Sequence, residues 1–338
     1  MKYLNIVFCI VSLLVTTAIA VTPNVGGRLI GMSTRPRPKG LISNFHVSHV
    51  TIGYQGGPIM TGAVNVYQIF YGDWSKKAAA RKLLSYFINN LSSSRWFDIT
   101  REYFELDDLN RTHYVTGPIR TAKYFYDNYS HGKSLSHIAI RNIVRGAIKR
   151  KYLPTDYNGI YVVYPSEDVT SQDFCETLCG YHFYFGNDTS AMIKYAFIGD
   201  PSTQCPSACS ALQYPNSPNG LFGADSMANI LGHELVETLT DPLASSWIDS
   251  GESVRFLLGT HYLLDAGSTS TVQDLNSRLF LSTYAFPPSS QENADKCAWQ
   301  FGNNHTKNGN MWNIKLGARK FLLQENLSLR KQACVMKL

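Results

Sequence analysis

The placement of cysteine is the feature that most constrains the fold of this chain. One of its seven cysteines, Cys9, lies in an apolar run over residues 6–15, which follows Lys2 and leads to a small-residue sequence ending at Ala20. This pattern predicts a signal peptide over residues 1–20 with cleavage after Ala20. The run is shorter than the roughly 20 apolar residues that span a bilayer, so we expect no membrane span in the mature chain.

The six remaining cysteines predict three disulfides, because an even number of cysteines in an oxidising compartment is typical of a disulfide framework. Their fifteen possible pairings stay open at this point. A zinc cluster built from the two Cys-x3-Cys pairs is the alternative, but thiolate zinc sites belong mostly to reducing compartments. The six residues are Cys175, Cys179, Cys205, Cys209, Cys297 and Cys334.

Secretion also bears on the expected modifications and partners. The formal net charge is +6 at pH 7, but the cations form no block interleaved with aromatic residues, so nucleic acid is not an expected partner. Extracellular or cell-wall components are the expected partners, and a weak attraction to acidic extracellular polymers is all that this charge supports. Six Asn-x-Ser/Thr sequons predict a glycoprotein, and they lie at Asn90, Asn110, Asn128, Asn187, Asn304 and Asn326.

The apolar periodicity predicts alternating strands and helices after a lead-in. Residues 21–53 are rich in Gly, Pro, Ser and Arg and are expected to form a flexible or propeptide-like lead-in. The remainder, residues 54–338, is expected to form a single layered α/β or α+β domain, in which helices flank a mixed sheet. The expected strands cover 63–71, 160–164 and 195–198, and the expected helices follow a Ser75 cap, cover 140–148, and begin near Asp225.

The last of these helices, over residues 224–240, carries the sequence His233-Glu234-Leu235-Val236-Glu237. Residues four apart share one face of a helix, so one cation can bridge His233 and Glu237. In the zinc-hydrolase pattern His-Glu-x-x-His, the outer residues hold the metal and the inner Glu takes a proton from its bound water. The sequence therefore predicts a zincin-like helix with His233 and Glu237 as zinc ligands and Glu234 as the catalytic base. The alternative is a solvated His–Glu pair on a helix surface.

Several short motifs occur in a fixed order between residues 52 and 338. Among them are Phe-Tyr-Gly-Asp-Trp at 70–74, Cys-Gly-Tyr-His at 179–182 and Asp-Lys-Cys-Ala-Trp at 295–299. Together they resemble the phosphate-induced protein/EXORDIUM-like family, and this chain resembles the subset that keeps the His-Glu-x-x-Glu helix. The resemblance implies a secreted plant-type protein of the apoplast or cell wall, linked to growth and cell expansion, without a settled activity.

The resemblance also sets apart residues 251–291. In the family, the segment after the helix runs directly into a Glu-x-x-Asp-x-Cys-Ala-Trp sequence, whereas here 41 residues intervene. We expect these residues to be an insertion, which is either a translated retained intron or a real surface loop. Its removal brings Glu292 and Asp295 close behind the helix.

A carboxylate from a following segment is how many helix-borne zinc sites obtain a third ligand, so we predict Glu292 or Asp295 for that part. The alternative is that Glu292 and Asp295 are surface residues that position Cys297 for its disulfide. His182 is a further candidate ligand, with a structural hydrogen-bonded histidine as its alternative. Asp241, which precedes a proline, is expected to end the helix rather than to bind the ion.

Two classes of function therefore remain open. One is a non-catalytic extracellular glycoprotein of the cell wall. The other is a secreted zinc-dependent, peptidase-like hydrolase that uses the His233 to Glu237 motif.

Overall fold

The computed structural model describes residues 31–34, 52–249 and 291–338. The predicted signal peptide and residues 251–290 of the predicted insertion lie outside the described residues. The two flanks of that insertion lie side by side, because the Asp249 N–H donates to the Gln291 carbonyl at 2.8 Å. Among the helices of the described residues, none is long and apolar enough to cross a membrane.

A five-stranded mixed sheet lies at the centre, in the order β5-β2-β7-β10-β9. The first four strands are parallel, and β9 runs antiparallel to β10 at one edge. The prediction of a mixed α/β sheet is thus confirmed, and the three predicted strands correspond to β2, β7 and β10. The bounds are β2 (Val64–Tyr71), β5 (Ile119–Asp127), β7 (Gly159–Pro165), β9 (Gly180–Phe185) and β10 (Ile193–Ile198).

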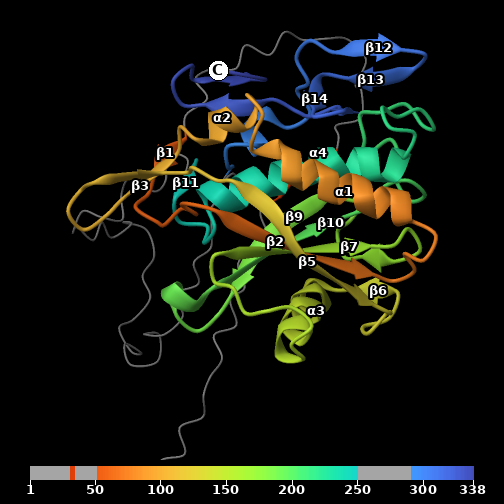
Figure 1. The fold of residues 1–338 in the computed structure, drawn as a ribbon, viewed down its shortest axis with the longest axis horizontal. Helices are drawn as coiled ribbons and strands as arrows, with labels where there is room; N and C mark the ends of the chain where they lie inside the picture. The colour runs from red at the N-terminus through yellow and green to blue at the C-terminus, as the bar shows by residue number, and fades with distance from the viewer. Residues whose placement is uncertain (1–30, 35–51, 250–290) are drawn as a thin grey trace, which may run out of the picture. The chain divides into compact units, whose positions relative to one another are not determined.

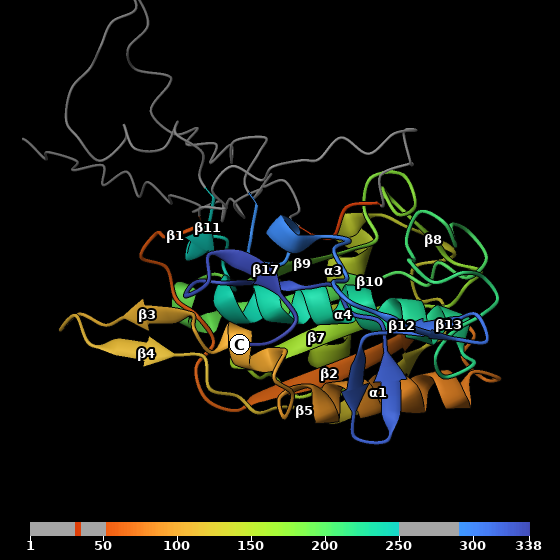
Figure 2. The ribbon, with the colours of Figure 1, turned by 90° about the horizontal axis from the view of Figure 1, so that it is seen from above.

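Helices cover both faces of this sheet. α1 (Ala78–Leu91) and α4 (Phe222–Thr240) lie on one face, and α3 (His137–Lys149) lies on the other (Figure 1). α1 and α3 each bury one apolar stripe, as their periodicity predicts. α4 is buried almost all round, because the C-terminal segment runs along its outer side (Figure 2).

Within the described residues, the remaining elements are one short helix, two 3-10 turns and six two-stranded ribbons. They are α2 (Phe97–Thr100), η1 (Thr189–Ala191) and η3 (Asp295–Cys297), with the ribbons β1 (Gly53–Tyr54) and β11 (Trp247–Ile248), β3 (Phe104–Leu106) and β4 (Thr112–Tyr114), β6 (Ser134–Leu135) and β8 (Thr170–Ser171), β12 (His305–Lys307) and β13 (Asn310–Trp312), β14 (Ile314–Leu316) and β15 (Arg319–Phe321), and β16 (Asn326–Ser328) and β17 (Ala333–Val335).

Three disulfides hold the loops around α4, and they confirm the predicted number. Two of them fasten the entry to β9 to the loop that precedes α4, and the third fastens η3 to β17. The cysteines are paired rather than gathered around zinc, so the thiolate alternative is excluded. The pairs are Cys175–Cys205, Cys179–Cys209 and Cys297–Cys334.

Several local expectations are corrected by the structure. Ser75 does not cap α1, because its N–H and Oγ both donate to Asp73 Oδ1 in a local turn and the helix begins only at Ala78. Residues 31–34 are not a free lead-in, since they pair with residues 177–179. The sequon at Asn326 is buried, and its Nδ2 donates to Thr100 Oγ1, so the folded chain leaves no space for a glycan there.

The other sequons lie nearer the surface. Asn90 is partly buried on α1, and the exposed ones are Asn110, Asn128, Asn187 and Asn304. Glycosylation of these five stays a prediction.

Candidate metal centre

α4 brings its three motif residues into the interior rather than onto a solvated surface. The side chains of His233, Glu234 and Glu237 are all fully buried. His233 and Glu237 lie one turn apart, with His233 Nε2 3.1 Å from Glu237 Oε1. This burial shows that the alternative of a solvated surface pair is wrong. A buried ionisable pair needs further partners to offset its lost hydration.

Asp295 completes one donor set. Its Oδ1 lies 3.4 Å from His233 Nε2, and its backbone N–H donates to Glu237 Oε1 at 2.9 Å. The 3-10 turn η3 holds it in place, and the neighbouring Cys297 anchors that turn through its disulfide. His233, Glu237 and Asp295 thus present one ligand atom each, all within 4.8 Å of one another.

Gln324 orients the imidazole of this set. Its Oε1 lies 3.2 Å from His233 Nδ1, and its Nε2 donates to the Ala294 carbonyl at 2.7 Å. Since the amide nitrogen of Gln324 is used by Ala294, its oxygen faces His233 and accepts the Nδ1 proton. That tautomer leaves the Nε2 lone pair directed at Glu237 and Asp295, as in metal-binding histidines.

His182 belongs to a second donor set that shares Glu237. It projects from β9, where its Nε2 lies 3.5 Å from Glu292 Oε2 and its Nδ1 lies 3.7 Å from Glu237 Oε2. His182 Nδ1 is also 3.4 Å from Glu234 Oε2. Both carboxylates predicted as a third ligand are therefore in the cluster, with Asp295 beside His233 and Glu292 beside His182.

The charge of this cluster requires compensation. Five carboxyl groups surround two imidazoles in the buried interior, and within the described chain seven of their polar atoms make no hydrogen bond. Burying a charged group without a partner costs several kcal/mol, so this number of such atoms in one place fits a cation binding site. The seven atoms are His182 Nδ1, His233 Nε2, Glu234 Oε2, Glu237 Oε2, Asp241 Oδ2 and both carboxyl oxygens of Glu292.

The pKa shifts have the same origin. Burial raises the pKa of Glu237 to about 7, although the His233 charge opposes the rise. Burial also raises the pKa of Glu292 well above its usual range, and the charges of Glu237 and Asp241 add to the effect. Burial alone would lower the pKa of His233, but the carboxylates of Glu237 and Asp295 outweigh it and raise that pKa well above its usual range. The metal-free cluster therefore retains protons that a bound cation would release.

Zinc fits the first donor set best. Zinc takes imidazole nitrogen and carboxylate oxygen at about 2.0–2.2 Å in tetrahedral geometry, which places neighbouring ligand atoms roughly 3.3 Å apart. The 3.1 and 3.4 Å separations from His233 Nε2 match that spacing. With three protein ligands, a bound zinc would keep its fourth position for water or substrate, which is the pattern of catalytic rather than structural zinc.

Asp241 closes the end of α4, as predicted. The helix ends at Thr240, and Asp241 Oδ1 accepts the N–H groups of Ser245 and Ser246 at 2.6 and 2.8 Å.

The sequence analysis missed two residues that contact the cluster. One is Gln324, and the other is Met32, which donates its backbone N–H to Glu234 Oε1 at 3.0 Å. A lone glutamine among apolar residues and a methionine in a Gly- and Pro-rich segment carry no local signal for either role.

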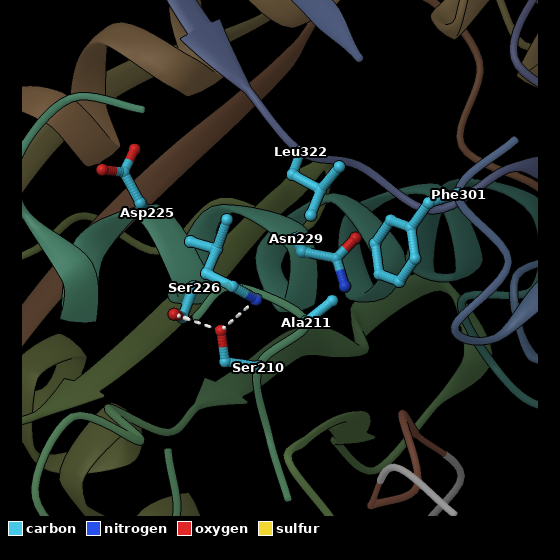
Figure 3. A pocket seen from close by; sticks show the side chains of 8 residues that line it. Ser210, Ala211, Asp225, Ser226, Asn229, Phe301 and Leu322 are labelled. Atoms are coloured by element: carbon cyan, nitrogen blue, oxygen red, sulfur yellow. Dashed lines mark hydrogen bonds between the residues drawn. The ribbon is translucent and has the colours of Figure 1, made fainter. Parts of the chain in front are cut away.

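A small pocket lies beside the N-terminal part of α4, outside this cluster (Figure 3). Within it, Ser210 Oγ lies 2.8 Å from Ser226 Oγ and accepts the Leu212 N–H at 3.0 Å. Asn229 joins the two regions, because it lines the pocket and its Oδ1 accepts the Gln324 N–H at 2.7 Å. The pocket thus adjoins the residue that orients His233.

The fold and this cluster define a disulfide-bonded α/β protein with a buried histidine–carboxylate site. The phosphate-induced protein 1 conserved region matches residues 52–260, so the chain belongs to that family.

Curated relatives bear related names. Protein EXORDIUM-like 3 of Arabidopsis thaliana is 31% identical over 221 residues, which cover 59% of this chain and 64% of that protein. Protein EXORDIUM-like 5 of Arabidopsis thaliana is 29% identical, covering 67% and 66%, and Protein PHOSPHATE-INDUCED 1 of Nicotiana tabacum is 28% identical, covering 57% and 66%. The chain thus spans slightly less than two thirds of the length of each of these relatives.

A solved chain described as "Structure of a chaperone-substrate complex" matches 53% of this chain at 14% identity and a TM-score of 0.27. At this identity and TM-score, the similarity supports no conclusion about the fold or function of this chain.

Proposed function

We propose that this chain is a secreted, zinc-dependent hydrolase that cleaves peptide bonds. The observation that carries the proposal is the convergence of His233 Nε2, Glu237 Oε1 and Asp295 Oδ1, with His233 Nδ1 held by Gln324. A buried set of three zinc ligands with an oriented histidine, next to a glutamate that is not a ligand, is the donor arrangement of metallohydrolases.

Each residue of the cluster has a part in this proposal. A bound zinc supplies a polarised water and a Lewis acid for the substrate carbonyl. Glu234 follows His233 directly on α4 and acts as the base that accepts the proton of the attacking water and then delivers it to the leaving amine. His182, 3.4 Å from Glu234 Oε2, balances the charge of that carboxylate.

The extracellular location is part of the same proposal. It is supported by the N-terminal signal pattern, by three disulfides and by the family to which the chain belongs. The partners that this location offers are cell-wall proteins and acidic polymers, and a role in growth would follow from processing of the former.

The test is metal analysis of the secreted protein followed by a hydrolysis assay. We expect about one zinc per chain in the wild type, little zinc in His233→Ala, and unchanged zinc in His113→Ala, a half-exposed histidine outside the cluster. Glu234→Gln should keep its zinc and lose peptide hydrolysis. A wild-type chain without bound metal would overturn the proposal.

One observation favours a second candidate, a non-catalytic extracellular protein with a structural cation. Glu234 Oε1 accepts the Met32 N–H, so this carboxylate has a structural role in holding residues 31–34. In that case zinc binds as above and ties α4 to η3, but neither the wild type nor any variant hydrolyses peptides.

A further inference from the structure

Residues 31–34 form a short antiparallel pair with residues 177–179, just before β9. Ser33 lies opposite Leu178. The Thr34 N–H donates to the Thr177 carbonyl at 3.0 Å, and the Cys179 N–H donates to the Met32 carbonyl at 2.7 Å. These are the two bonds that flank such a pair in a regular antiparallel ladder.

The ladder departs from this pattern at Met32, and the departure leads to the metal centre. The next regular bond would run from the Met32 N–H to the Cys179 carbonyl, but that carbonyl accepts the Gly199 N–H at 3.2 Å. The Met32 N–H donates instead to Glu234 Oε1 at 3.0 Å, in the buried interior. Glu234, the proposed catalytic base, thus accepts the hydrogen bond that the Cys179 carbonyl would accept in a regular ladder.

Residues 31–34 make close contacts with α4, β9 and Trp299. Met32 is fully buried, and its Sδ lies 3.9 Å from Asn229 Nδ2 on α4. A Cβ on Gly31 would lie 2.4 Å from the Gly180 carbonyl oxygen, so only glycine permits this approach to β9. Trp299 Nε1 donates to the Ser33 carbonyl at 2.9 Å from the opposite side.

We infer that residues 177–179, Trp299 and Glu234 form a binding site for an extended polypeptide, and that residues 31–34 of this chain occupy it as a tethered, substrate-like inhibitor. The ligand class is a peptide strand with glycine followed by an unbranched apolar residue, recognised chiefly through its backbone. The inhibitory part rests on the proposed role of Glu234, because the Met32 N–H engages Glu234 Oε1 and residues 31–34 occupy the place beside that carboxylate that a substrate strand would take. The binding part does not depend on the metal.

The test uses the full chain with Gly31→Val, which keeps every residue of the site and prevents the close approach to β9. Ser33→Ala is the matched control, because the Ser33 side chain is exposed and only its carbonyl is used. Hydrogen exchange at the Cys179 amide should become about tenfold faster or more in Gly31→Val and stay unchanged in Ser33→Ala. Thermal unfolding of both variants verifies that they fold.

A labelled peptide with the sequence of residues 29–36 provides the second measurement. By fluorescence anisotropy it should bind Gly31→Val at least about tenfold more tightly than the wild type, whose site is filled by its own residues 31–34. A peptide with valine in place of the glycine should not bind. Slow Cys179 exchange in a folded Gly31→Val, or equal peptide binding by the two chains, would overturn the inference.

These readouts separate this inference from the proposed function. Peptide binding without zinc means that the proposed hydrolase is wrong and the binding site real. Zinc-dependent peptide hydrolysis with unchanged Cys179 exchange means that the hydrolase is real and the binding site wrong. If both hold, Gly31→Val should also hydrolyse peptides faster than the wild type.

Discussion

Replacing Glu237 by glutamine should change stability in opposite directions with and without zinc. Burial raises the pKa of Glu237 from 4.5 to about 7 in the folded chain. The folded chain therefore pays a penalty that is absent below about pH 4.5, grows as the pH rises, and is complete above about pH 7. At about pH 8 the difference amounts to on the order of 3 kcal/mol, which Glu237→Gln removes.

Zinc should make the wild type more stable than Glu237→Gln, which reverses their order in the metal-free state. At a zinc concentration about 100-fold above the dissociation constant, binding stabilises the wild type by roughly 2.7 kcal/mol, and Glu237→Gln loses most of that because it lacks an anionic ligand. For a domain of this size, about 1 kcal/mol moves the Tm by roughly 2–4 °C. We expect the metal-free variant to melt about 6–12 °C above the metal-free wild type, and zinc to raise the wild type alone by about 5–10 °C.

Differential scanning fluorimetry at about pH 8 measures both shifts, with a chelator and then with zinc. The control is Asp225→Asn, which neutralises a buried carboxylate on the same helix about 18 Å away and should keep the zinc response. The reasoning fails if metal-free Glu237→Gln melts below the wild type, or if its zinc-induced shift equals that of the wild type.

Three further predictions concern the surroundings of this site. The Tm of the metal-free wild type should fall as the pH rises from about 5 to 8, because the raised pKa values of Glu237 and His233 mean that the folded chain holds more protons than the unfolded one. For His233 the stabilisation is complete below its ordinary pKa of 6.5 and is lost as the pH rises through the raised folded value, so a rising Tm would contradict this assignment. Gln324→Leu should weaken zinc binding about 10- to 100-fold in a chelator competition, and unchanged affinity would show that the amide does not orient His233. Gly180→Ala should destabilise the chain by about 1–3 kcal/mol in urea unfolding, since its Cβ would lie 2.5 Å from Ile230 Cγ2, and a neutral effect would mean that β9 and α4 separate easily.

Much of the fold follows from local patterns. The β-branched and aromatic runs predict β2, β7 and β10, because a buried parallel strand must be apolar on both faces. β5 escaped prediction because it is an edge strand with exposed charged residues, and β9 because its six residues mix glycine, histidine and aromatic side chains. Such strands are defined by their neighbours rather than by their own sequence.

The sequence by itself determined which residues of α4 share a face. Helical spacing of four places His233 above Glu237 wherever the helix lies, and an even number of cysteines favours disulfides whatever their pairing.

Tertiary structure alone decided what meets that face. The cluster joins residues from β9, α4 and η3, with Gln324 behind it and Met32 in front of Glu234, and these come from five separate stretches of the chain. No local pattern encodes such long-range contacts, because they form only when the sheet, the covering C-terminal segment and the disulfides fix those stretches around one buried, electrostatically demanding site.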